Sequence, residues 1–571
     1  MPEQRTQQHT IYTVTANCQD CYRCVRACPV KAIRVSGGQA KVDNALCIKC
    51  GTCIRECPQH AKTILSTVEN AKALLLENSC VVASIAPSFA AEYREWRTRR
   101  LPSALRKLGF KYVAETAEGA SFVTEKSFAN GAKGSVCTAC PAVVNYVEKY
   151  MPSYLDVLMP IVSPMVAHGR MLKQRYPGCA VVFIGPCAAK KEEAERPEHR
   201  GAVDVVLTFE ELDGWLEDER IELANCSESG FDSGWEVGDS RLFPIQGGML
   251  KTGNIKTDAT DAKILHISGA EDILDLFQKE VWDFDIVEPL FCKGGCINGP
   301  AFRDERSLYE RRADIINYTQ KSEKAVSKKA CEIQYETAFE PNMPQLAEVT
   351  QNQIDKVWER TGKTDPELRL NCGACGYKSC EDNAIAVVRG LAEPEMCMPY
   401  MRRLAQQRTD RIIETTPIGI VILDSELNII NMNPAFKKMF MCNNGVLGRQ
   451  ISYLINAEGF ESLTNGRLEQ CESIQTKYGI KYHEMLYALR EERQYVGIYS
   501  DISKLKFDPS QQNLIKSQTL KHAQEFLDHQ IRFSQEMAHF LGKSTAQSEE
   551  MVGRLMNLYE DVEDKEPEET A

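Results

Sequence analysis

The chain has 571 residues, of which 43% are hydrophobic and 26% charged, and its formal net charge is -12. This length and composition indicate a globular protein of several domains. The acidic balance argues against nonspecific nucleic-acid binding, and no apolar run reaches the roughly 18 residues of a membrane helix. The first ten residues carry no signal-peptide core, so we expect a cytoplasmic protein with neither nucleic acid nor membrane as partner.

Cysteine usage narrows the class further. Sixteen of the 23 cysteines fall into metal-ligand spacings. Without a secretory signal, this pattern favours reduced, metal-binding thiols over disulfides. Four others have no ligand spacing, and we predict them to be buried core residues: Cys80, Cys179, Cys226 and Cys331.

Residues 1–65 contain the spacing C-x2-C-x2-C-x3-C-P twice. This repeat is typical of bacterial ferredoxin modules with two [4Fe-4S] clusters, in which the fourth cysteine of each run ligates the other cluster. A zinc site or surface thiols are the alternatives. The sequence therefore predicts one cluster on Cys18, Cys21, Cys24 and Cys57, and a second on Cys28, Cys47, Cys50 and Cys53.

From residue 66 to 360, apolar strand-like runs alternate with longer segments of helical periodicity, which predicts an α/β domain with mostly parallel strands. The strand-like runs are "CVVASIAP", "AVVFIGP" and "AKILHISG", and the helical candidates are "LPSALRKLGF" and "AEDILDLFQKEV". Four further cysteines lie in Gly/Pro-rich turns after apolar runs: Cys140, Cys187, Cys292 and Cys296. Ligands bind at strand ends in open α/β sheets, so these four thiolates could hold one [4Fe-4S] cube.

The segments "VCTACPAVV", "FIGPCAAKKEE" and "EPLFCKGGCINGPA" resemble the three signatures of the [FeFe]-hydrogenase catalytic domain. The resemblance implies two small parallel sheets around an H-cluster, with those four cysteines holding its cube. It implies that Cys296 also bridges to a diiron subcluster with CO, cyanide and a dithiolate bridge. Lys190 would donate to one cyanide, Glu193 would lie near that lysine, and Pro87 and Ser88 would contact the other cyanide.

Departures from the family pattern cluster around the position of the diiron unit. Ala139 stands where the family's proton-relaying cysteine is expected, and a methyl group cannot transfer protons. Gly185 and Leu290 replace two methionines of the pocket wall, and Val143 replaces a tryptophan. This combination resembles the sensory branch of the family.

Residues 361–403 contain the uneven spacing C-x2-C-x4-C-x16-C. Zinc would suit two C-x2-C pairs better, whereas this spacing resembles a small four-cysteine [4Fe-4S] domain. We expect "DNAIAVVRGLA" to form a helix that leads toward the last cysteine. The predicted ligands, which we call the C-terminal cysteine site, are Cys372, Cys375, Cys380 and Cys397.

Metal chemistry stops after this site. Residues 404–505 resemble a PAS sensor domain, with two strands in "IGIVILDSELNIINMN", a helix opening at Asn433-Pro434 and a closing "YVGIYSDIS". Residues 506–571 predict an amphipathic helix for dimerisation or partner binding, or for packing back on PAS, and then a disordered acidic tail. The fold class is thus multidomain α/β and α+β.

Two functions are compatible with these features. The first is a sensory [FeFe]-hydrogenase with slow, reversible H2 oxidation and proton reduction, coupled through four [4Fe-4S] clusters to PAS. The second is an iron-sulfur scaffold or electron-transfer protein without the diiron subcluster. The expected partners are H2 and protons, diiron maturation proteins, a redox partner, a kinase or phosphatase acting in trans, and possibly a second copy of the chain.

Overall fold

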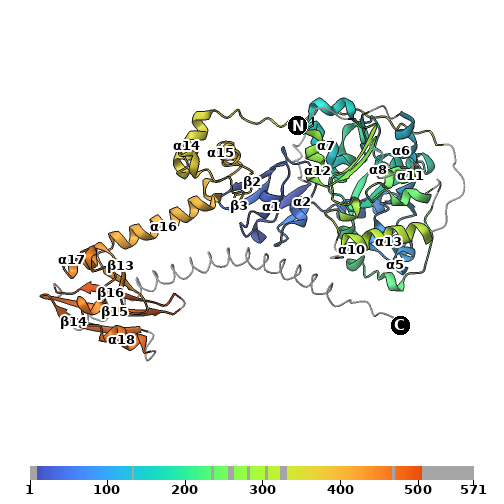
Figure 1. The fold of residues 1–571 in the computed structure, drawn as a ribbon. Helices are drawn as coiled ribbons and strands as arrows, with labels where there is room; N and C mark the ends of the chain where they lie inside the picture. The colour runs from blue at the N-terminus through green and yellow to red at the C-terminus, as the bar shows by residue number, and fades with distance from the viewer. Residues whose placement is uncertain are drawn as a thin grey trace, which may run out of the picture. The chain divides into compact units, whose positions relative to one another are not determined.

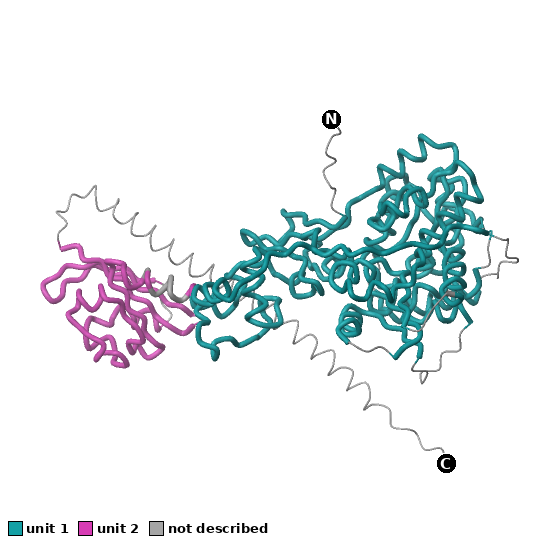
Figure 2. Tube along the Cα trace, turned by 90° about the horizontal axis from the view of Figure 1, so that it is seen from above, with its two compact units in different colours: residues 1–403 teal, residues 404–571 magenta. Residues whose placement is uncertain are grey.

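The computed structural model describes residues 10–130, 134–232, 234, 237–254, 263–279, 283–302, 306–321, 331–465, 470–490 and 492–503. The chain divides into two compact units, residues 1–403 and 404–571 (Figures 1 and 2). The helix expected within 506–571 lies outside the described residues. Within the ranges given, no helix is long and apolar enough to cross a membrane.

The first unit begins with the ferredoxin module, which has two antiparallel two-stranded sheets and two short helices. Its apolar core includes five of the eight predicted ligand cysteines, four of them buried. The elements are β1 Ile11–Thr13, α1 Arg23–Ala27, β2 Ile33–Ser36, β3 Gln39–Val42, α2 Thr52–Arg55 and β4 Lys62–Ile64.

The next domain contains two parallel sheets, as expected. One has the order β6-β5-β8-β9 and the other β10-β11-β7. Strands β5 and β8 are buried throughout because both faces of their sheet are covered. The strands are β5 Val81–Ile85, β6 Tyr112–Glu115, β7 Ser135–Val136, β8 Ala180–Gly185, β9 Val205–Thr208, β10 Ile264–Ser268 and β11 Ile286–Leu290.

Helices surround these sheets, with α8 packed against β5 and β8 and α5 against β6 (Figure 1). Pro141 begins α7 and Pro164 begins α8, where a missing N–H costs nothing. The helices are α3 Val68–Glu77, α4 Phe89–Glu92, α5 Trp96–Lys107, α6 Ala117–Asn130, α7 Pro141–Tyr150, α8 Pro164–Arg175, α9 Ala189–Glu195, α10 Phe209–Asp218, α11 Gly248–Thr252, α12 Ala270–Phe277 and α13 Leu308–Lys321.

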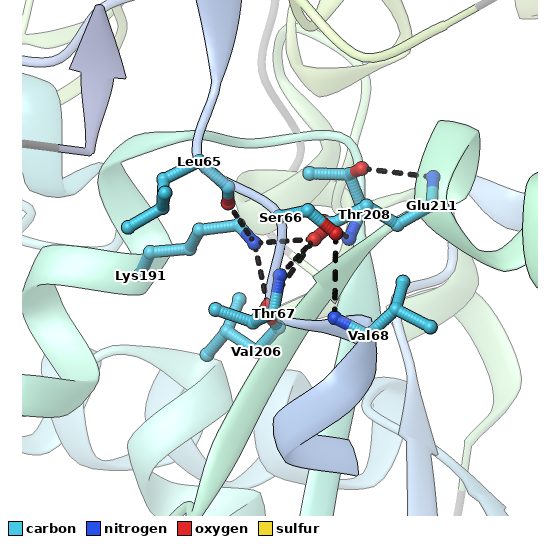
Figure 3. Close-up of polar contacts among 8 residues, drawn as sticks. All are labelled: Leu65, Ser66, Thr67, Val68, Lys191, Val206, Thr208 and Glu211. Carbon is cyan, nitrogen blue, oxygen red and sulfur yellow. Dashed lines mark hydrogen bonds and ion pairs between the residues drawn. The ribbon is translucent and has the colours of Figure 1, made fainter. Parts of the chain in front are cut away.

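The segment that leaves the ferredoxin module is fastened to this domain by a buried lysine. Lys191 Nζ donates to Leu65 O at 2.9 Å and to Thr67 Oγ1 at 2.7 Å, and it pairs with Glu211 at 2.8 Å (Figure 3). Glu211 also completes a capping box with Thr208 at the start of α10. Lys191 therefore has a structural role, in contrast to the neighbouring functional candidate Lys190.

The expectation of reduced thiols is wrong for two of the four cysteines predicted as buried core residues, and one of these two, Cys80, is only partly buried. Cys80 and Cys179 directly precede the neighbouring parallel strands β5 and β8, and they form a disulfide with a Cα–Cα distance of 4.7 Å. Cys226 is buried as expected, whereas Cys331 is only half-buried. Strand pairing, which sequence spacing does not reveal, brings Cys80 and Cys179 together.

The small C-terminal domain of this unit contains α14 Gln351–Thr361, α15 Cys380–Val388 and the start of α16 Met398–Thr415. Helix α14 ends at Thr361, so it crosses the domain boundary expected at residue 360. It packs against α15 and therefore belongs to this small domain. The domain contacts the ferredoxin module through main-chain groups. Val35 N donates to Leu391 O at 2.9 Å, and the Gly37 and Gly38 amides donate to Glu393 at 2.6 and 3.2 Å.

The second unit has the expected PAS arrangement, a five-stranded antiparallel sheet in the order β13-β12-β16-β15-β14. Asn433 caps α17, since its Oδ1 accepts from Phe436 N at 2.9 Å. Four aromatic rings fill the core: Phe436, Phe440, Tyr482 and Tyr499. The elements are β12 Gly419–Leu423, β13 Ile429–Met432, α17 Pro434–Met439, α18 Glu458–Thr464, β14 Gln470–Lys477, β15 Ile480–Leu489 and β16 Gln494–Asp501.

Candidate metal centres and hydrogenase-like site

Three loops at the carboxyl ends of strands in the two parallel sheets carry four cysteines. The chain leaves β7 toward Cys140, β8 toward Cys187, and β11 toward Cys292 and Cys296. Ala301 N donates to Pro186 O at 3.3 Å, which ties the segment after Cys296 to the loop of Cys187. The parallel fold therefore gathers the four separated cysteines that we call the hydrogenase cysteine site.

These thiols lie in an environment that disfavours free thiolates. Burial, reinforced by Cys140, raises the pKa of Cys187 to about 12. Burial also raises the pKa of Cys292 well above its ordinary value, with Arg55 opposing the shift and Cys187, Cys296 and Cys140 adding to it. Iron cations would offset this cost, because each thiolate needs a countercharge in a buried site.

Glu193 lies beside Lys190, as the resemblance implies. Lys190 Nζ is 2.7 Å from Glu193 Oε2, and it donates to Ala139 O at 3.2 Å. The two side chains are 11% and 5% exposed. The lysine is therefore a buried cation held one residue from the ligand Cys140, and it has a carboxylate partner that offsets its desolvation.

The side-chain hydroxyl of Ser88, which was predicted to contact the other cyanide, is buried. Ser88 follows β5 and is 1% exposed, and within the described structure its Oγ has no hydrogen-bond partner. An unpaired buried hydroxyl is costly unless another group accepts its hydrogen bond. Pro87, Ser88 and Lys190 thus fit the predicted diiron subcluster, whose cyanides would accept such bonds.

The departures from the family pattern have physical consequences at the pocket wall. A Cβ added at Gly185 would lie 2.8 Å from the Phe183 ring and 3.1 Å from Ala86, so neighbouring side chains fill the space beside this glycine. Leu290 and Val143 are buried, and Ala139 is partly buried. The space beside Gly185 is therefore filled by Phe183 and Ala86.

Sequence reasoning missed Glu288, on β11. Its side chain is 3% exposed, its Oε1 accepts from Met249 N at 3.1 Å, and its Oε2 has no partner among the described residues. Burial raises the pKa of Glu288 to about 8. The sequence signal for Glu288 is that it is the single charged residue in the otherwise apolar strand "IVEPL", which overlaps the third signature.

In the ferredoxin module, burial is the main cause that raises the pKa of Cys24, whose charged neighbours are Lys62, Cys21, Cys18 and Cys57. One cavity is lined by all four cysteines of the second predicted set, Cys28, Cys47, Cys50 and Cys53. Backbone amides donate to three sulfurs, those of Cys28, Cys47 and Cys57, as iron-sulfur ligands require.

The C-terminal cysteine site also lines one cavity, together with Lys363. Lys363 was not anticipated from the sequence, because it lies nine residues before Cys372 and belongs to no spacing motif. Across the described ranges, no group of three or more His, Cys, Asp or Glu side chains is placed to hold a single metal ion. As predicted ligands of a four-iron cube, the cysteines of each set would lie farther apart than the ligands of one ion.

Comparisons with protein families match four segments of the chain. Residues 17–62 match a 4Fe-4S dicluster domain, and residues 79–300 match the iron only hydrogenase large subunit, C-terminal domain. Residues 369–399 match a putative Fe-S cluster domain, and residues 407–474 match a PAS domain. The chain is therefore a hydrogenase-like iron-sulfur protein with a PAS domain, and its residues 79–300 are of the [FeFe]-hydrogenase-like family.

Two kinds of curated relative match. Iron hydrogenase 1 of Clostridium pasteurianum is 25% identical over 42% of this chain and 52% of its own length. The NADP-reducing hydrogenase subunit HndD of Solidesulfovibrio fructosivorans is 25% identical over 52% of this chain and 58% of its own length. The cytosolic Fe-S cluster assembly factor NAR1 of Kluyveromyces lactis is 33% identical over 23% of this chain and 30% of its own length. The chain thus spans about half of each hydrogenase.

Solved structures give similar matches. A variant of the [FeFe]-hydrogenase HydA1 from Chlamydomonas reinhardtii aligns with 46% of this chain and 91% of its own, at 20% identity and a TM-score of 0.36. The PAS domain of an HTR-like protein from Haloarcula marismortui aligns with 18% of this chain and 99% of its own, at 21% identity and a TM-score of 0.16.

Proposed function

We propose that this chain is a sensory [FeFe]-hydrogenase that reacts slowly and reversibly with H2 and passes the resulting redox change to its PAS domain. The observation that carries the proposal is the buried ion pair of Lys190 and Glu193, at 2.7 Å, beside the hydrogenase cysteine site. Glu193 offsets part of the cost of burying this cation, and an anionic ligand that faces Lys190 would offset more of it.

When bound, the diiron subcluster would supply the metal centre at which hydrogen is split or formed. Cys296 would bridge it to the cube held with Cys140, Cys187 and Cys292. Lys190 would donate to one cyanide and Ser88 to the other, which fixes the orientation of the group. Ala139 offers no ionisable group, so its side chain moves no proton and turnover should be slow.

Electron transfer would use contacts between the ferredoxin module and the hydrogenase-like domain. Lys149 Nζ donates to Ala45 O and Cys47 O, both at 2.9 Å, and Tyr150 OH donates to Leu46 O at 2.6 Å. Cys50 and Cys140 lie in the same apolar cluster. The second ferredoxin cluster would therefore stand next to the hydrogenase cube.

The other end of the path would be the C-terminal cysteine site. Tyr377 lies between the second and third cysteines of this site and is buried against the ferredoxin module, and Cys375 and Cys28 are the charged groups near its hydroxyl. An electron from hydrogen would thus pass through the ferredoxin module to the last cluster, after which α16 begins. A kinase or phosphatase in trans would read the PAS domain.

Infrared spectroscopy of protein produced with the diiron maturation machinery tests the proposal. We expect bands of iron-bound CO and cyanide, and we expect Lys190→Met to lose them or shift the cyanide bands. Lys191→Met is the matched control, because this neighbouring lysine is equally buried but bonds to Leu65, Thr67 and Glu211. It should leave the bands unchanged.

The second candidate is an iron-sulfur scaffold that lacks the diiron subcluster. The similarity to assembly factors named NAR1, at 33% identity over 143 residues, is the observation that favours it. Absence of the infrared bands after successful maturation, with all cubes present, would replace the sensory proposal by this one.

A further inference from the structure

Lys363 is a buried ammonium in direct contact with a predicted cluster ligand. Its Nζ donates to Cys380 Sγ at 3.2 Å, and the residue is 7% exposed. Its side chain also lines the cavity that all four cysteines of the C-terminal cysteine site line. The ammonium is therefore a buried hydrogen-bond donor to one predicted ligand, inside the cavity of the whole site.

The surrounding backbone holds this lysine in place. Lys363 N donates to Trp358 O at 2.7 Å, and Arg369 Nε donates to Lys363 O at 3.0 Å. Arg403 of α16 donates to the carbonyls of Thr361 and Gly362 directly before it. The backbone on both sides of Lys363 is thus held by hydrogen bonds, which limits how far its buried side chain can move from Cys380.

The position of Cys380, whose sulfur accepts the hydrogen bond from Lys363, further stabilises negative charge on that sulfur. Cys380 is the first residue of α15, where the helix dipole favours negative charge, and its N–H donates to Asn371 Oδ1 at 2.8 Å. In the first ferredoxin set the Asp20 carboxylate lies 3.8 Å from Cys18 Sγ, and Lys62 is a charged neighbour of Cys24. A cation that donates directly to a ligand sulfur, as Lys363 does to Cys380, favours an added electron.

We propose that Lys363 raises the reduction potential of the cluster on the C-terminal cysteine site, so that an electron from the ferredoxin module resides there, beside α16. The inference rests on the proposed function for its electron source. In the step itself this cluster gains one electron and a ferredoxin-module cluster loses it. The electron adds negative charge to the sulfurs, and the fixed ammonium stabilises that charge most strongly where water is excluded.

The test uses full-length protein made without the diiron maturation machinery, so its result is independent of the infrared experiment. Reduction is followed by electron paramagnetic resonance at set potentials with dithionite, and the signal is assigned as the one lost in Cys375→Ser. In Lys363→Met the ratio of reduced to oxidised cluster at the wild-type midpoint should fall about tenfold or more, which is about 59 mV for one electron.

Lys378→Met is the matched control, because Lys378 lies on the loop between Cys375 and Cys380 but is exposed to solvent. It removes the same charge, and screening by water and salt should limit its effect to less than about threefold. Equal shifts in the two variants, or no shift in Lys363→Met, would overturn the proposal.

Lys363→Gln separates charge from hydrogen bonding, since its amide keeps a donor. A downward shift in this variant supports the role of the charge, and a wild-type potential contradicts it. Loss of iron from this one site in both Lys363 variants would also overturn the proposal, because Lys363 would then be a requirement for assembling the cluster.

Discussion

Residue 139 offers a backbone hydrogen-bond acceptor but no ionisable side chain. The Lys190 ammonium bonds to the Ala139 carbonyl, so a substitution at this position leaves that contact available. General acid-base groups within reach contribute about 10²- to 10⁴-fold to a rate. Ala139→Cys should therefore raise hydrogen production and uptake in matured protein, by less than the full range because Gly185, Leu290 and Val143 also differ.

The measurement is the rate in both directions, with infrared bands as the check that the site is intact. Ala139→Ser is the control, because its hydroxyl has a similar size and is a much weaker acid than a thiol. Unchanged rates in Ala139→Cys with intact bands would locate the limit in the pocket wall, where Phe183 and Ala86 fill the space beside Gly185.

His168 makes the stability of the hydrogenase-like domain depend on pH. It is fully buried, its Nδ1 lies 2.7 Å from Ser84 Oγ, and burial with a contribution from Arg175 lowers its pKa to about 3. The unfolded chain binds a proton near pH 6.5 and the folded chain does not. Its contribution to stability is therefore complete above pH 6.5 and is lost as pH falls, by about 1.4 kcal/mol per pH unit.

Denaturant midpoints between pH 7 and pH 5.5 measure this loss. The matched variant is His168→Gln, which keeps a polar side chain but cannot titrate. The wild-type midpoint should fall more steeply with acidification than that of the variant. Parallel curves would show that other groups, such as the neighbouring Glu118 and Arg175 pair, determine the acid sensitivity.

At the scale of elements, a single carboxylate joins two modules of the first unit. Glu393 accepts hydrogen bonds from the amides of Gly37 and Gly38, in the turn between β2 and β3. We expect Glu393→Ala to weaken this contact by about 1–3 kcal/mol, because two amides lose their acceptor. Faster hydrogen exchange at Gly37 and Gly38 would report it. Glu395→Ala, which removes a more exposed ion pair with Arg360, should leave these amides protected.

Element types and module order could largely be predicted from the sequence. Local signals define them: the repeated cysteine spacing, the apolar runs that became β5, β8 and β10, and the Asn433-Pro434 opening of α17. The hydrogenase cysteines were expected at strand ends, and they lie there because parallel strands share one carboxyl edge.

The remaining features depend on contacts between distant segments. Lys363 and Glu288 gain their significance only after folding brings them beside cysteines that are distant along the chain. The Cys80–Cys179 disulfide depends on the pairing of β5 with β8. The expected boundary at residue 360 divided helix α14. The sequence does not show that α14 packs against α15, because α15 begins 19 residues after α14 ends.

At the scale of the whole molecule, the number of clusters is the first quantity to measure. Protein without the diiron unit should hold four [4Fe-4S] clusters, two on the ferredoxin module and one on each later cysteine site. Cys380→Ser should remove only the C-terminal one, since that site has its own cavity and its own four cysteines. Iron analysis with electron paramagnetic resonance checks the count. Zinc at this site, with unchanged iron in the variant, would contradict the assignment.

The division into two compact units makes a stronger prediction about independence. All sixteen predicted ligands lie in residues 1–403, and α16 begins directly after Cys397. A chain that ends after Thr415 keeps this helix and its Arg403 contacts with Thr361 and Gly362. It should therefore contain as much iron per molecule as the full chain.

A second truncation, after Cys397, keeps every ligand but removes α16. Without Arg403 the segment that carries Lys363 loses an anchor on its N-terminal side, so the C-terminal cluster should be lost or become labile while the other three remain. Iron content and the resonance signals of the two truncated proteins distinguish the cases. Loss of this cluster already in the longer protein would show that the PAS unit stabilises the site, and full retention in the shorter one would show that α16 does not.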